Sequence, residues 1–81
     1  MPAPSSRLEH AICDLVARGW PVSQAARWFG IHPRTARGWL DQGRRGRAAF
    51  VRFTESVEAA RLEHERELEA LAEQLRERVA S

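Results

Sequence analysis

Apolar side chains recur three and four residues apart along most of the chain, which is the spacing of one face of an α-helix. The first such stretch contains Leu8, Ala11, Ile12, Leu15 and Val16. Ser6 and Glu9 fit a capping box, in which both side chains satisfy free backbone amides, so we expect a helix that starts near Ser6. Gly19 and Pro21 predict where this helix ends.

Two shorter helices are predicted after this first one. The pattern favours a helix over residues 22–29, ended by Gly30, and another over residues 33–42. Pro33 suits the first position of the second of these, because a proline there lacks only an amide that has no helical partner. A basic loop of residues 43–46, which begins at a glycine, is expected to follow.

The segment from Ala48 to Val79 contains no glycine and no proline and is rich in Ala, Leu, Glu and Arg. These residue types are strong helix formers, so we predict one helix of about 30 residues. No stretch of the chain shows the alternation that is typical of a strand. The fold class is therefore predicted to be all-α, with three short helices followed by one long C-terminal helix.

Residues 22–41 have the spacing of two helices that cross and share a small core. The apolar side chains expected in this core are Ala25, Phe29, Ile31, Ala36 and Trp39. Ala26 is small where the second helix would approach, and Gly30 suits a tight turn with a positive φ. Trp28 falls at an outward position, but core packing is favoured for it over a binding role.

This pattern resembles the helix-turn-helix family of DNA-binding domains. The resemblance implies a helix-turn-helix DNA-binding domain over residues 7–57. The first six residues, which include two prolines and two serines, are expected to form a flexible arm, and residues 58–81 are expected to form a C-terminal helix for self-association. It also implies that residues 33–42 form the recognition helix, which reads the major groove of double-stranded DNA. The residues predicted to contact bases are Arg34, Thr35, Arg37 and Gly38, and those predicted to contact phosphates are His32, Arg44, Arg45 and Arg47.

The charge distribution agrees with a nucleic-acid partner. Residues 1–52 carry nine arginines against three acidic residues, a net charge of +6, whereas residues 53–81 carry four arginines against eight glutamates, a net charge of −4. Such an asymmetry between two halves indicates a nucleic-acid-binding front and a back with another task. All thirteen basic residues are arginines.

The long helix has two apolar parts. Phe50, Phe53 and Val57 are expected to pack on the core of the first three helices. The distal apolar residues form a seam for self-association: Leu68, Leu71, Leu75 and Val79. Arg61 and His64 interrupt the stripe between them. A dimer is the first choice and a larger ring the alternative. In a different class of function, the acidic helix would be a protein-interaction adaptor that docks on a partner.

Several other functions are not expected. The single cysteine, Cys13, makes no disulfide within the chain and is predicted to be a small core residue. His10 and His64 are expected at the surface, and no histidine or cysteine spacing indicates a metal. We predict no cofactor, and no catalysis, since no nucleophile stands beside a base. No apolar run reaches the roughly 18 residues of a membrane span, and no secretory signal pattern is present, so the cytoplasm is expected.

The resemblance extends to phage proteins beyond the core pattern. Residues 19–65, which include Gly38-Trp39-Leu40 and Ala59-Ala60-Arg61, are most similar to small terminase subunits. That family binds phage DNA at the packaging start, forms rings and recruits a larger ATPase subunit. The alternatives are a transcriptional repressor and an accessory factor of recombination or transposition.

Overall fold

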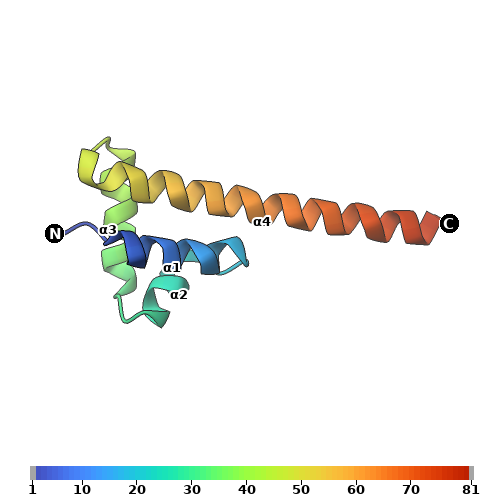
Figure 1. Ribbon diagram of the computed structural model, residues 1–81, viewed down its shortest axis with the longest axis horizontal. Coiled ribbons are helices and arrows are strands. Elements are labelled where there is room, and N and C mark those ends of the chain that lie inside the picture. Colours follow the sequence, from blue (N-terminus) through green and yellow to red (C-terminus); the bar gives the residue numbers. More distant parts are fainter. Residues whose placement is uncertain (1, 81) are drawn as a thin grey trace.

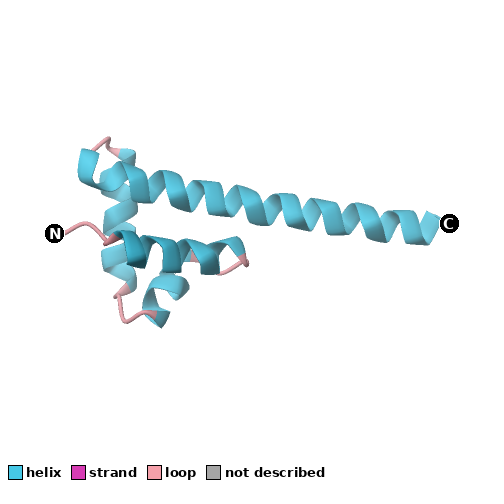
Figure 2. Cartoon of the chain, viewed as in Figure 1, coloured by secondary structure: helices cyan, strands magenta, loops and turns pink. Residues whose placement is uncertain are grey.

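The computed structural model describes residues 2–80, and these residues form helices and loops without a strand (Figures 1 and 2). The helices are α1 (Ser6–Ala17), α2 (Val22–Trp28), α3 (Pro33–Arg44) and α4 (Ala48–Ala80). Helices α1 and α3 pack on the first part of α4, α2 packs on α1 and α3, and the rest of α4 extends away from them (Figure 1). We call α1, α2, α3 and residues 48–64 of α4 the head. The all-α prediction is confirmed.

The N-terminus of α1 differs from the predicted capping box. Ser5 is the N-cap, and its hydroxyl oxygen accepts a hydrogen bond from the Leu8 amide at 3.2 Å. Glu9 does not cap the helix, because its side chain is buried against α4. There its carboxylate accepts a hydrogen bond from the Ser56 hydroxyl at 3.2 Å and lies 3.5 Å from the Arg52 Nε. The cap therefore lies one residue earlier than predicted, and Glu9 links two helices.

The arm before α1 makes a specific contact with the core. The indole N–H of Trp39 donates a hydrogen bond to the carbonyl oxygen of Pro2 at 3.0 Å. Trp39 itself is buried, as predicted. A buried indole needs a partner for its single donor, and the backbone of the arm supplies that partner.

Helix α3 is longer than predicted, because Gly43 lies inside it rather than beyond its end. At this position α3 crosses α4 so closely that a Cβ on Gly43 would lie 2.7 Å from the Phe50 carbonyl oxygen. Glycine is thus required by the close approach of two helices, not by a turn. The connecting loop is reduced to residues 45–47, where Gly46 has the positive φ of 80°.

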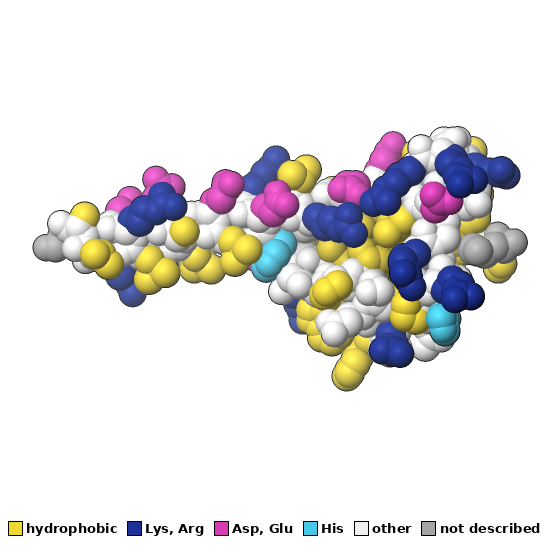
Figure 3. All heavy atoms as spheres, turned by 180° about the vertical axis from the view of Figure 1, so that it is seen from behind, with side chains coloured by type: hydrophobic (Ala, Val, Ile, Leu, Met, Phe, Trp, Pro, Cys, Tyr) yellow, Lys and Arg dark blue, Asp and Glu magenta, His cyan; other side chains and the backbone are white. Residues whose placement is uncertain are grey.

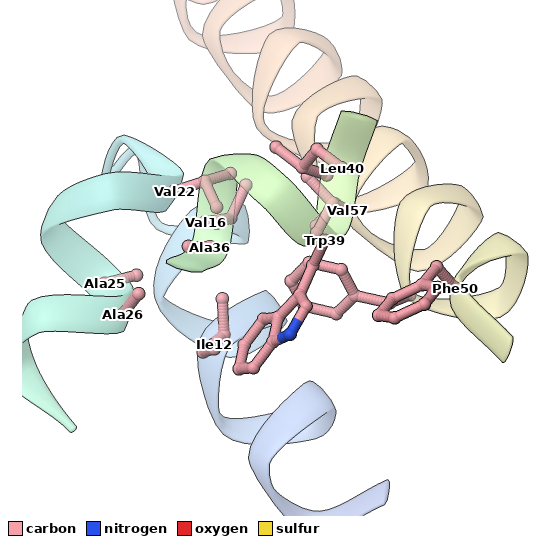
Figure 4. Close-up of a cluster of buried hydrophobic side chains, with 12 residues drawn as sticks. Ile12, Val16, Val22, Ala25, Ala26, Ala36, Trp39, Leu40, Phe50 and Val57 are labelled. Atoms are coloured by element: carbon pink, nitrogen blue, oxygen red, sulfur yellow. The ribbon is translucent and has the colours of Figure 1, made fainter. Parts of the chain in front are cut away.

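All four helices contribute side chains to one core (Figure 4). Phe53 is its largest fully buried side chain, and it meets Trp39 edge-on, with ring centroids 5.5 Å apart. Phe50 and Val57 are also buried, which confirms that the beginning of α4 packs on the first three helices. The other buried apolar side chains are Ile12, Val16, Val22, Ala25, Ala26, Ala36, Leu40 and Ala60.

Three side chains lie in environments other than those predicted. Trp28, the last residue of α2, is 70% exposed rather than in the core, and Phe29, which follows it, is 40% exposed. Trp28 and Trp20 pack in a T-shaped arrangement, with ring centroids 5.8 Å apart. His64 was expected at the surface, but its ring packs over Gly19 and its Nδ1 is buried without a hydrogen-bond partner.

Cys13 packs half-buried against the core, and burial together with the nearby charge of Glu9 raises the pKa of its thiol from 9.0 to about 11. Only the thiolate attacks alkylating reagents. At pH 8 we therefore expect iodoacetamide to label Cys13 in the folded protein about 100-fold more slowly than in the urea-unfolded chain. Equal labelling rates in the two states would contradict this environment.

Candidate nucleic-acid interface

The turn between α2 and α3 is closed by backbone hydrogen bonds and by one glycine. The Ile31 amide donates to the Ala26 carbonyl at 2.9 Å, and Gly30 between them has a φ of 80°. Ala25, Ala26 and Ala36 are fully buried at the crossing of the two helices. Their small side chains let α2 hold α3 at close range, which fixes how α3 presents its outer face.

His32 and Pro33 start α3. Pro33 occupies the first turn, and the Nδ1 of His32 accepts a hydrogen bond from the Arg34 amide at 3.1 Å. Since Nδ1 is an acceptor, the proton of the neutral ring is on Nε2, which remains exposed to solvent. His32, predicted to contact a phosphate, is thus the N-cap of the helix and still has one outward N–H donor.

Helix α3 has a buried face and an exposed face. Ala36, Trp39 and Leu40 point into the core. Arg34 and Arg37, three residues apart, are exposed on the other side. Thr35 and Gly38, also predicted to contact bases, are only half-buried and lie at the margin of that exposed face. The structure therefore brings the four predicted base contacts together on the outer side of one helix.

The arginines differ in whether an acidic side chain already holds them. Arg44 lies 3.8 Å from Glu58, and Arg45 lies 3.3 Å from Asp41. Within residues 2–80, no ion pair engages Arg34, Arg37 or Arg47. Exposed ion pairs contribute only about 0–1 kcal/mol, so a phosphate can replace the carboxylate beside Arg44 or Arg45. Arg34 and Arg37 are available without breaking a pair.

Asp41 belongs to the same exposed face and was missed by the sequence reasoning. It stands four residues after Arg37 and seven after Arg34, which places the three side chains in one row on α3. A carboxylate repels phosphates, but it accepts a hydrogen bond from the N4 amino group of cytosine. The helical spacing alone was a sufficient signal for including it among candidate base contacts.

Basic side chains and exposed apolar side chains lie in different parts of the molecule (Figure 3). In the view of Figure 3, dark blue side chains gather on the face of the head toward the viewer, where α3 is nearest. Along the free part of α4, acidic side chains follow one edge and apolar side chains the other. The predicted seam residues Leu68, Leu71, Leu75 and Val79 are 52%, 54%, 61% and 87% exposed. They lie far from α3.

The part of the chain that the structure describes contains neither a metal-ligand cluster nor a membrane-spanning helix. Residues 2–80 bring together no group of three or more His, Cys, Asp and Glu side chains that would hold a metal ion. None of their helices combines the length and the apolar character that crossing a membrane requires.

Comparison with known proteins identifies the family of the head. The homeodomain-like domain family matches residues 4–52, more than half of the chain. This match covers α1, α2, α3 and the beginning of α4, including the turn and the arginine-bearing helix described above. No curated protein and no solved structure matches the chain. The protein belongs to the homeodomain-like family of helix-turn-helix DNA-binding domains.

Proposed function

We propose that this protein recognises a specific sequence in double-stranded DNA through α3 and self-associates through the distal part of α4, without catalysis of its own. The DNA-binding part of this proposal rests on two exposed arginines of α3, Arg34 and Arg37. Among the described residues, no acidic side chain forms an ion pair with either of them. A guanidinium binds the O6 and N7 atoms of guanine with two parallel hydrogen bonds. Thr35 and Gly38 let the helix approach the groove closely.

The surrounding charges support this docking. His32, Arg44, Arg45 and Arg47 lie exposed at the two ends of α3. At these positions they suit the two phosphate backbones that border a major groove. The N-terminal 52 residues have a net charge of +6. Binding is therefore expected to weaken steeply with salt, because each neutralised phosphate releases counterions.

Arg34→Ala and Arg37→Ala are each expected to relax the base preference at one position, with a loss of about 5- to 150-fold on the preferred sequence. Arg45→Ala is expected to weaken all sequences alike and to reduce the salt slope by about 1. The measurement is fluorescence anisotropy on the selected duplex and on single-base variants of it, at three salt concentrations. Uniform losses for all three variants would contradict the assignment of Arg34 and Arg37 to base readout.

Site selection from a random duplex pool, at near-physiological salt, supplies the preferred sequence and tests the proposed function. A defined motif supports sequence-specific recognition. If no motif emerges, the DNA-binding proposal fails and the acidic α4 becomes the candidate for an adaptor surface.

The arrangement of the half-sites also discriminates between biological processes. The resemblance to small terminase subunits makes the start of phage DNA packaging one candidate, with a larger packaging subunit as partner, and this predicts several direct repeats bound by a ring. An inverted repeat instead supports a two-fold dimer that regulates transcription or assists recombination.

A further inference from the structure

One apolar stripe runs along the whole of α4 and changes its role part-way. Val57 and Ala60 are buried in the head, and His64 packs over Gly19. At about 100° per residue, Leu68 and Leu75 lie within about 20° of Val57 around the helix axis. Leu71 lies within about 20° of Ala60 by the same count. The exposed leucines therefore continue the face that packs on the head.

This continuity restricts how a second copy can lie on the stripe. The head occupies the stripe side of α4 as far as His64, where Val16, Gly19 and Trp20 close a hollow of about 210 Å³ with α4. A parallel partner helix, about 8–10 Å away on that side, would have to pass through the head of the first chain. An antiparallel partner meets only the free stretch, residues 67–80, and its own head lies at the opposite end.

The direction of the basic face favours the same orientation. In Figure 3 the arginine-rich face of the head points toward the viewer, while the apolar stripe follows the lower edge of α4. An antiparallel pair has its two-fold axis perpendicular to the page, so both basic faces point toward the viewer. A parallel pair has its axis along α4, which turns the second basic face away. Only the antiparallel pair presents both α3 helices to one side.

The two halves of the free stretch carry opposite net charges, so two copies match in charge when they run in opposite directions. Residues 67–73 carry three glutamates and no arginine, a net charge of −3, whereas residues 74–80 carry Arg76 and Arg78 against Glu77, a net charge of +1. A parallel pair places the two acidic halves side by side. An antiparallel pair places each acidic half beside a basic one, which is the favourable arrangement.

We infer that two copies of this chain pair through an antiparallel contact of their α4 helices, in which Leu68 faces Val79 of the other copy and Leu71 faces its Leu75. This inference rests on the proposed self-association and adds its orientation and register. This register brings all four exposed stripe residues of one chain, Leu68, Leu71, Leu75 and Val79, against those of the other. The stripe residues left exposed in one chain are then covered by the same residues of the other.

The antiparallel pair also sets the spacing on DNA. Helix α3 crosses α4 near Phe50 and Thr54, and the two-fold axis lies near residue 73. At 1.5 Å per residue, the two α3 helices are about 65 Å apart along α4, close to two turns of B-DNA. Half-site centres about 20 base pairs apart are therefore expected, rather than the single turn that many helix-turn-helix dimers span.

Pulsed electron paramagnetic resonance on two singly spin-labelled full-length chains tests this orientation. Both carry Cys13→Ser, and the label is attached through Glu55→Cys in one and Gln74→Cys in the other. Both native side chains are exposed on α4. The antiparallel pair predicts about 55 Å between the two Glu55 labels and less than about 25 Å between the Gln74 labels, which lie beside the two-fold axis.

Comparing the distances at the two labelled positions distinguishes a wrong orientation from a lack of pairing. A short distance at both positions means a parallel pair and overturns the inferred orientation, although self-association stands. If neither position shows a defined distance at several hundred micromolar protein, the chain does not pair through α4, and the self-association proposal itself fails. DNA binding by α3 is measured separately and is decided by neither result.

Discussion

Phe53→Ala is expected to destabilise the head by about 3–5 kcal/mol, which is most of the stability of so small a domain. Phe53 is fully buried at the point where α4 meets α3, and its ring packs edge-on against Trp39. Truncation removes these contacts and leaves a cavity that the surrounding helices cannot close. The measurement is thermal unfolding followed by circular dichroism at 222 nm, with near-ultraviolet circular dichroism to report the packing of the tryptophans.

Leu62→Ala is the matched control for this prediction. Leu62 lies on the same helix but is 51% exposed, so its truncation is expected to change the free energy of unfolding by no more than about 0.5 kcal/mol. If Phe53→Ala lowered the melting temperature by as little as Leu62→Ala does, the core assigned to the head would be wrong.

Leu71→Asp is expected to prevent the proposed dimer from forming and to lower the affinity for a two-site duplex by 100-fold or more. The charge at the centre of the stripe would have to lose its water in the contact between two α4 helices. Loss of the dimer removes the gain from binding two half-sites at once, which reaches about 10² to 10⁴. Sedimentation equilibrium measures the association, and anisotropy titrations on duplexes with one and two half-sites measure the DNA affinity.

Leu62→Asp provides a control of the same chemistry. Leu62 and Leu71 are 51% and 54% exposed, but they lie on opposite sides of α4, about 180° apart around its axis. Leu62→Asp should leave both the association and the DNA affinity unchanged, and Leu71→Asp should leave the affinity for a single half-site unchanged. Equal effects of the two substitutions would show that general helix solubility, not a specific face, governs the association.

The elements of this protein follow closely from local sequence signals. A helix from Ala48 to Val79 was predicted because no glycine or proline interrupts this segment, and the observed α4 ends one residue later. Pro33 and Gly30 correctly marked where α3 begins and where the turn lies. The packing of Phe50, Phe53 and Val57 on the first three helices was also predicted, since their spacing repeats that of one helical face.

The candidate DNA face was predicted less completely. The outer position of Arg34 and Arg37 follows from the helical period once the buried positions Ala36 and Trp39 are known. The helical period also places Asp41 in the same row, but Asp41 was not predicted because only basic and small polar side chains were considered as DNA contacts. The pairing of Arg44 with Glu58 joins α3 to α4 and therefore depends on how two separate helices cross.

The sequence by itself determined the number and order of the helices, their ends to within one or two residues and which face of each is apolar, because these depend mainly on contacts within a few residues. Only the tertiary structure decided what each apolar or glycine position meets. Gly43 was expected just beyond the end of α3, but it lies where α3 crosses α4. Glu9 was expected to cap α1, but its side chain is held by α4. Trp28 reads as core but stays exposed. Each outcome depends on a second helix whose distance and angle arise from the packing of the whole core, which no local pattern encodes.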